Sequence, residues 1–179
     1  EREYFMKAVI TLQSKLHFST QQLVGFMSSS VATRIESKEL LKAILTFKTR
    51  LEFSTDQLVT FMCDSVAVRI ESDDFMTAII LLKTKLELSA EQLVKFMNES
   101  VATRIESEDF VKAITSIKQK LQLSTDQLVT FMCGSIAARI ESNDFVKAIF
   151  AIKTKLELST EQLVTCMPCI AAHIESEDF

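Results

Sequence analysis

Apolar residues recur along this chain at the spacing of one face of an α-helix. Two such stripes follow each other between residues 54 and 86: first Leu58, Phe61, Met62, Val66 and Ile70, then Phe75, Ala78, Ile79 and Leu82. A period of 3.6 residues places each set on one side of a helix. No segment alternates apolar with polar residues, so the pattern predicts an all-α fold without a sheet.

Polar residues mark the starts of these predicted helices. Ser54 and Gln57 form a Ser-x-x-Gln capping box, in which the serine oxygen accepts from a backbone amide and the glutamine side chain reaches back. Ser72 precedes the second stripe and can cap it, and the acids Asp73 and Asp74 suit the positive end of a helix dipole. The two stripes therefore read as two helices, each with its own start signal.

The same pair of stripes recurs with a step of 35 residues, as the leucines at its head show: Leu16, Leu51, Leu86, Leu121 and Leu156. An isolated helix pair cannot bury its apolar face, so neighbouring repeats must stack. We therefore expect an α-solenoid of two-helix repeats, forming one continuous array over residues 1–179. Its parts are a half repeat at 1–15, repeats at 16–50, 51–85, 86–120 and 121–155, and a partial repeat at 156–179.

One region of each repeat favours an alternative with three shorter helices. The middle of the first helix contains Ser28-Ser29-Ser30, Cys63-Asp64-Ser65, Asn98-Glu99-Ser100 or Cys133-Gly134-Ser135, depending on the repeat. These residue types are poor helix formers. A break at this point would give three-helix repeats, and the sequence leaves both versions open.

The charge is unevenly distributed along the chain. The net charge is −4, yet residues 1–50 carry eight Lys and Arg against four Asp and Glu, while residues 156–179 carry five acids and no Lys or Arg. No apolar run is long enough to cross a membrane, and four cysteines do not suggest a disulfide framework. We therefore expect an intracellular protein, cytoplasmic or nuclear. The first residue is Glu1 rather than methionine, which is consistent with a missing natural N-terminus.

Catalytic chemistry has little support in the sequence. The two histidines, His17 and His173, lie in different repeats, and no nucleophile motif or phosphate-binding loop is present. Cys166, Cys169 and His173 would share one helix face as zinc ligands, but a structural zinc site normally needs a fourth. We expect no enzyme activity, no metal and no cofactor.

One adjacent pair of residues varies while the rest of the repeat stays nearly constant. We interpret this pair as the partner-binding strip of a non-enzymatic scaffold for protein–protein interaction; its members are Ser28, Ser29, Cys63, Asp64, Asn98, Glu99, Cys133 and Gly134. A constant frame with a variable pair lets a repeat array present different contacts from one scaffold. The alternative is that these positions are exposed and unconstrained.

A second candidate function is nucleic-acid binding. One arginine recurs per repeat and could contact a phosphate: Arg34, Arg69, Arg104 and Arg139. The competing interpretation is that each stabilises a helix end and pairs with a glutamate of the neighbouring repeat.

Short motifs add a resemblance to two helical-repeat families that bind duplex nucleic acid. The segment "LSTEQLV" (158–164) is similar to the opening of transcription-activator-like effector repeats, which also carry a variable pair. The rhythm of "LELSAEQLVKFMNESVATRI" resembles mitochondrial transcription termination factor repeats. The chain departs from both: "SVA" or "SIA" replaces the Gly-Gly of the first family, and Val66, Val101 and Ile136 replace the proline of the second. The resemblance implies duplex binding, against which the acidic balance argues.

The ends of the chain suggest a third function. Residues near both ends look like ordinary interior positions, namely Phe5, Val9 and Leu12 on one side and Leu163, Met167 and Ile174 on the other. Terminal repeats normally carry a polar outer face. This chain is therefore expected to be a segment of a longer array or a self-stacking subunit of a structural filament.

Overall fold

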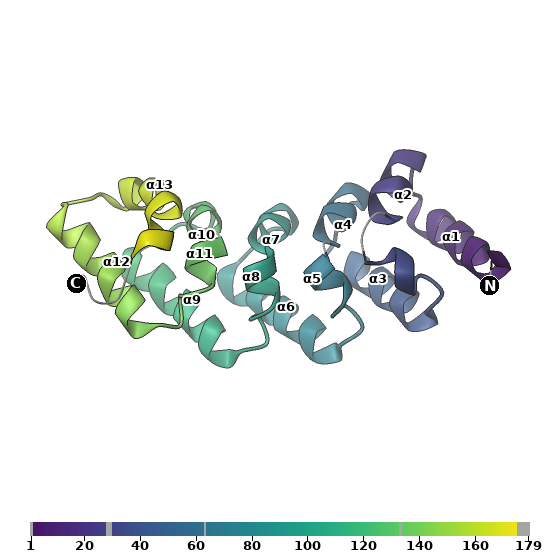
Figure 1. Cartoon of the computed structure of the whole chain (residues 1–179), viewed down its shortest axis with the longest axis horizontal. Coiled ribbons are helices and arrows are strands. Elements are labelled where there is room, and N and C mark those ends of the chain that lie inside the picture. The colour runs from purple at the N-terminus through teal and green to yellow at the C-terminus, as the bar shows by residue number, and fades with distance from the viewer. Residues whose placement is uncertain (1, 28–29, 63, 133, 175–179) are drawn as a thin grey trace. The chain divides into compact units, whose positions relative to one another are not determined.

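Helices are the only regular secondary structure in the part of the chain that the structure describes. This computed structural model describes residues 2–27, 30–62, 64–132 and 134–174 (Figure 1). The predicted all-α class is confirmed, with 75% of the described residues helical. The chain divides into two compact units, residues 1–80 and 81–179, and the boundary lies inside one helix, α6 (Asp73–Leu86). The continuous array over the whole chain stays a prediction.

The N-terminal unit packs phenylalanines between its helices. Its elements are α1 (Arg2–Leu16), α2 (Thr20–Met27), the 3-10 turn η1 (Ala32–Arg34), α3 (Lys38–Arg50), α4 (Thr55–Phe61), α5 (Asp64–Ala67) and the start of α6. The ring centroid of Phe47 lies 6.0 Å from that of Phe61 and 6.4 Å from that of Phe75, and Phe53 lies 4.8 Å from Phe61. These tilted contacts are typical of aromatic cores.

The C-terminal unit stacks helices that hold the same place in successive repeats. After α6 it contains α7 (Ala90–Phe96), α8 (Glu99–Ala102), α9 (Glu108–Leu121), α10 (Thr125–Phe131), α11 (Gly134–Ala137), α12 (Asn143–Lys155), α13 (Thr160–Ile170) and the turn η2 (Ala171–His173). Helix α10 lies between α7 and α13, and α11 contacts both α8 and η2 (Figure 1).

The predicted capping boxes are confirmed. Ser54, Ser89, Ser124 and Ser159 each accept a hydrogen bond from the amide of the glutamine three residues later, and that glutamine accepts from the serine amide. The predicted cap at Ser72 is also present: its hydroxyl accepts from the amide of Phe75 at the start of α6. Ser37, Ser107 and Ser142 cap α3, α9 and α12 in the same way.

The helix ends use a motif that the sequence prediction missed. Residues just after α1, α3, α6, α9 and α12 have φ between 49° and 59°: His17, Glu52, Glu87, Gln122 and Glu157. The following amide bonds back five residues, as from Leu123 to the carbonyl of Lys118 at 2.9 Å. This is a Schellman motif, which usually has glycine at the left-handed position. The side chain after the left-handed residue is apolar and is buried at Phe18, Phe53, Leu88 and Leu123.

The first predicted helix of the repeat is broken into two short helices at α4/α5, α7/α8 and α10/α11. In these three repeats the two-helix version is wrong and the three-helix alternative is correct. The backbone leaves helical geometry at Met97, with φ −79° and ψ 70°, and the amide of Asn98 bonds the carbonyl of Phe96 at 2.9 Å. These values define an inverse γ-turn. Met62 and Met132 end α4 and α10 with similar angles. Helix α13 instead runs on to Ile170, with Pro168 inside it.

The predicted end residues differ in burial. Phe5 is 37% exposed, whereas Leu163, Met167 and Ile174 are buried within the C-terminal unit. None of the described helices combines the length and the apolar character that crossing a membrane requires.

Candidate interaction surface

Constant side chains of one repeat bond to the next repeat in both compact units. The capping-box residue Gln22 donates to Asp56 at 2.6 Å, and Gln92 donates to Asp126 at the same distance. Gln22 and Gln92 thus cap their own helices with the side-chain oxygen and bond the neighbouring helix with the side-chain nitrogen. The constant capping role is shared by Gln57, Gln127 and Gln162, whereas the bond to the next repeat is made by Gln22 and Gln92.

A second contact between repeats secures the end of the longer helix. Lys48 Nζ and Thr55 Oγ1 lie 3.2 and 3.4 Å from the carbonyl oxygen of Leu16, at the end of α1. Lys118 and Thr125 donate to the carbonyl of Leu86 at 3.0 and 3.5 Å. Carbonyls at a helix end lack partners within the helix, and a cation there also interacts favourably with the dipole.

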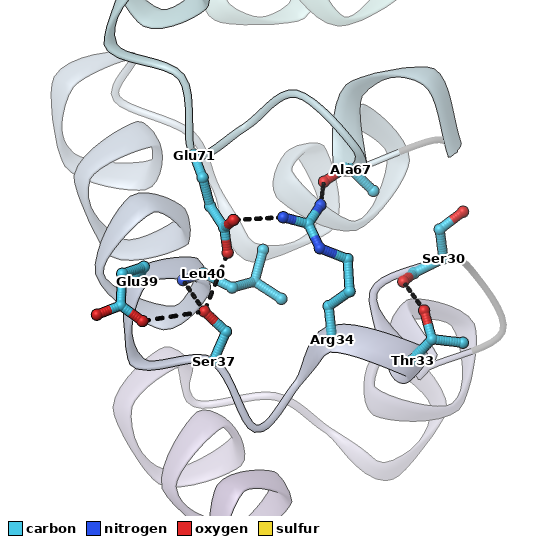
Figure 2. A network of polar contacts seen from close by, with 8 residues as sticks. All are labelled: Ser30, Thr33, Arg34, Ser37, Glu39, Leu40, Ala67 and Glu71. Carbon is cyan, nitrogen blue, oxygen red and sulfur yellow. Dashed lines mark hydrogen bonds and ion pairs between the residues drawn. The ribbon is translucent and has the colours of Figure 1, made fainter.

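The recurrent arginines make similar contacts. Arg34 donates from Nη1 to the carbonyl of Ala67 at 2.8 Å and from Nη2 to the carboxylate of Glu71 (Figure 2). The hydroxyl of Ser37, which caps α3, donates to the other oxygen of Glu71 at 3.1 Å. In the C-terminal unit Arg104 donates to Glu141 at 2.7 Å, and Ser107 donates to the same carboxylate at 3.0 Å.

The other two arginines each lie over a phenylalanine of the helix that follows them. Arg139 donates to the carbonyls of Ala171 and Ile174, and its guanidinium lies 4.5 Å from the ring centroid of Phe145. The guanidinium of Arg69 lies 5.2 Å from the centroid of Phe75. Arg34 and Arg104 thus make the glutamate pairs that the structural interpretation of the arginine series predicts, whereas Arg139 bonds carbonyls of the following segment instead. Phosphate binding by Arg34, Arg69, Arg104 and Arg139 stays a prediction, and it would have to compete with them.

The variable pairs fall at the break between the two short helices. Asn98 is half-buried: its side chain accepts from the amide of Val101 at 3.1 Å, which caps α8, and donates to the carbonyl of Met132 at 3.0 Å. Asn98 is therefore part of the frame. Glu99 and Gly134 are exposed, and a Cβ added at Gly134 would meet Ser100 Oγ at 3.7 Å, an ordinary contact.

The remaining members of the strip give less information. Ser28, Ser29, Cys63 and Cys133 lie outside the described residues, and Asp64 opens α5. The partner-binding role of the whole strip stays a prediction. For Glu99 and Gly134 the exposure that this role needs is present.

The described part of the chain contains no cluster of potential metal ligands. Cys166 is half-buried on α13 and its thiol contacts the carbonyl of Leu163, while Cys169 is exposed. No group of three potential ligands is placed to hold a metal ion within residues 2–174 as described. The pKa of Lys95 is raised because its ammonium donates a hydrogen bond to Glu91, but this pair is on the surface of α7.

A cationic groove lies between α1 and α3 in the N-terminal unit. It is open to solvent and has a volume of about 600 Å³. Its cations are Lys15 from α1 and Lys38, Lys42 and Arg50 from α3. Its apolar lining comes from Leu41 and Leu45, both half-buried, and from Thr46 and Thr49, whose hydroxyls donate to carbonyls of α3. Among the described residues, no acidic side chain lines it.

The neighbouring groove of the same unit has mixed charge. It encloses about 410 Å³ and is lined by the acids Glu39, Glu71 and Asp73 as well as by Lys42 and Arg50. The difference arises partly at one position, where Lys38 is replaced in later repeats by Asp73, Glu108 and Asn143. Sequence reasoning missed the groove because its cations come from two helices and each can be explained as an ordinary surface residue. The available signal was Lys38, a cation in the first turn of a helix, where the dipole disfavours it.

No protein-family model matches this sequence, and comparisons with curated proteins and with solved structures also find no match.

Proposed function

We propose that this chain is a non-catalytic scaffold of stacked helical repeats, an α-solenoid with a 35-residue step, and that it binds an acidic, amphipathic segment of a partner protein. The stacking is supported by the hydrogen bonds that constant residues make one repeat onward, such as Gln22 to Asp56 and Gln92 to Asp126. In repeat proteins these nearest-neighbour contacts carry much of the stability.

The proposal of an acidic, amphipathic partner is based on the groove between α1 and α3. Four cations surround an apolar lining, so carboxylates of a partner can pair with Lys15, Lys38, Lys42 and Arg50 while apolar side chains cover Leu41 and Leu45. An interface of this kind combines an apolar centre with a charged rim that sets specificity and association rate.

A protein segment suits this groove better than a nucleic acid does. A duplex presents a continuous line of phosphates, which would pass from the cationic groove onto Glu39, Glu71 and Asp73 of the next groove. Nucleic-acid binders usually carry a basic face across the whole domain. Here the net charge is −4 and the basic excess is confined to residues 1–50.

The test compares two charge-reversed variants with equal net charge. Lys38→Glu/Lys42→Glu changes the groove, and Lys112→Glu/Lys147→Glu changes the positions equivalent to Lys42 in later repeats. Glu108 already occupies the position equivalent to Lys38, and Lys42 is exposed, so the first variant is expected to fold. Both are titrated against a labelled amphipathic acidic peptide, a neutral Gln/Asn version of it and a DNA duplex, by fluorescence anisotropy.

The unmodified chain is expected to bind the acidic peptide and not the neutral one. Reversal at Lys38 and Lys42 should weaken binding at least about tenfold, which corresponds to 1.4 kcal/mol, while the control variant should change affinity about twofold or less. Tighter binding of the duplex, with a steep salt dependence from counterion release, would favour the nucleic-acid function instead. Equal loss in both variants would show that net charge, and not the groove, attracts the peptide.

A further inference from the structure

One leucine of the repeat series differs sharply from its counterparts in exposure. Leu16, Leu51 and Leu86 are 0% exposed and Leu121 is 3% exposed, whereas Leu156 is 64% exposed. These leucines hold the same place at the end of the longer helix in successive repeats. The sequence at Leu156 is therefore that of a buried position, yet the side chain lies on the surface.

The opposite end of the chain shows the same mismatch. Phe5 is 37% exposed, although the residues at its place in later repeats, Leu40, Phe75, Phe110 and Phe145, are at most 1% exposed. Tyr4, Met6 and Ile10 on the same helix are also exposed, at 73%, 54% and 59%. Helix α1 thus presents a broad apolar surface that its counterparts α3, α6, α9 and α12 do not.

The contacts at the interior leucines indicate what should cover Leu156. The carbonyl of Leu16 is held by Lys48 of the following long helix and by Thr55 of the following short one. Helix α1 and the start of α2 repeat this sequence pattern, with Gln13 at the place of Lys48 and Thr20 at the place of Thr55. The segment "FMKAVITLQSKL" (5–16) is also close to "FVKAIFAIKTKL" (145–156). The N-terminal segment of a second copy therefore has the sequence pattern of the repeat that would follow Leu156.

Charge favours the same arrangement. Residues 1–50 have an excess of four positive charges, and residues 156–179 carry five acids and no Lys or Arg, of which Glu175, Glu177 and Asp178 lie outside the described residues. Unlike charges attract each other, which favours contact between the N-terminal segment of one copy and the C-terminal segment of another.

We propose that the chain associates with itself head-to-tail, with the apolar surface of α1 around Phe5 in one copy packing on the end around Leu156 in another. The contact is heterologous: each copy uses two different surfaces, so the assembly can continue beyond a dimer. The inference rests on the stacked-repeat arrangement proposed above, but not on the cationic groove.

Two variants and a matched control test this contact. Phe5→Glu and Leu156→Glu each place a charge on one of the two surfaces. Val68→Glu is the control, because Val68 is 57% exposed and its place is exposed in the other described repeats as well. Leu163 is not a suitable probe, since it is 0% exposed and its replacement by glutamate would unfold the C-terminal unit.

The mass of each protein is measured by sedimentation equilibrium over about a hundredfold range of concentration at low and high salt. The unmodified chain and Val68→Glu should show an average mass that rises with concentration, whereas Phe5→Glu and Leu156→Glu alone should remain monomeric. An equimolar mixture of these two variants should form dimers and nothing larger, because only one intact surface of each kind remains.

A monomeric unmodified chain, a monomeric mixture, or dimers formed by either end variant alone would overturn the proposal. Far-ultraviolet circular dichroism verifies that the variants are folded. Peptide anisotropy on the same variants separates this proposal from the groove, since loss of self-association leaves Lys38 and Lys42 in place.

Discussion

Replacing Asn98 by alanine should destabilise the C-terminal unit, although this position belongs to the variable pairs. The side-chain oxygen of Asn98 accepts from the amide of Val101 and its nitrogen donates to the carbonyl of Met132, one repeat onward. Loss of the cap costs about 1 kcal/mol, and loss of a half-buried hydrogen bond costs about the same. We therefore expect the free energy of unfolding to fall by about 2 kcal/mol, measured by urea denaturation.

Two further variants separate the contribution of the helix cap from that of the hydrogen bond to Met132. Asn98→Asp keeps an oxygen that can cap α8 but loses the donor to Met132, so it should retain roughly half of the difference. Glu99→Ala removes the exposed neighbour and should change stability by no more than about 0.5 kcal/mol. If Asn98→Ala were as harmless as Glu99→Ala, the contact to the next repeat would contribute nothing and our account of the frame would be wrong. Exchanging whole variable pairs between repeats should therefore change stability at the Asn98 position.

Other predictions test the contacts within the frame. Ser124→Ala should lower the free energy of unfolding by about 1 kcal/mol, because it removes the hydroxyl oxygen that accepts a hydrogen bond from the amide of Gln127 in the capping box. A double-mutant cycle on Arg104 and Glu141 should give a coupling of about 0.5–1 kcal/mol that decreases with salt, since both side chains are partly exposed; a coupling of zero would mean that the pair is incidental. Gln122→Gly should raise stability by about 0.5–1 kcal/mol in thermal melts, because a left-handed residue with φ 54° is strained with any side chain, and a drop in melting temperature would contradict this.

Helix starts were predictable because their signals are local. A serine three residues before a glutamine, or before a pair of acids, specifies a cap whatever the helix later packs against. The core followed from the same periodicity, and residues such as Leu58 and Phe61 are buried as expected. Both the caps and the apolar stripes can be read from a single helical segment, without knowledge of what the helix packs against.

Helix ends and breaks were harder because they depend on more distant partners. Non-glycine residues such as Glu52 and Glu87 occupy the left-handed position after a helix, so the usual glycine signal is absent. The break at Met97 is stabilised by the cap from Asn98, whose other bond reaches the next repeat at Met132. Composition alone suggested only that a break could occur there.

The candidate interaction surface likewise contains contacts that the sequence predicts and a groove that it does not. The pairing of Arg34 and Arg104 with glutamates of the next repeat was predicted as an alternative to phosphate binding, whereas the bond from Arg34 to the carbonyl of Ala67 was not. The cationic groove was not foreseen, because Lys15 meets Lys38 and Lys42 only once α1 and α3 are in place. A surface of this kind belongs to the packing of two helices and not to either segment alone.

The position of a bound acidic peptide is the most direct test of the central claim. The chain, labelled with ¹⁵N and in its methyl groups, would be titrated with the amphipathic acidic peptide while its amide and methyl signals are recorded by NMR. We predict that the largest shifts occur at Leu41, Leu45 and Thr46, in the groove between α1 and α3. Shifts confined to the surroundings of Glu99 and Gly134, or the absence of any shift at peptide concentrations that saturate the anisotropy signal, would contradict the account.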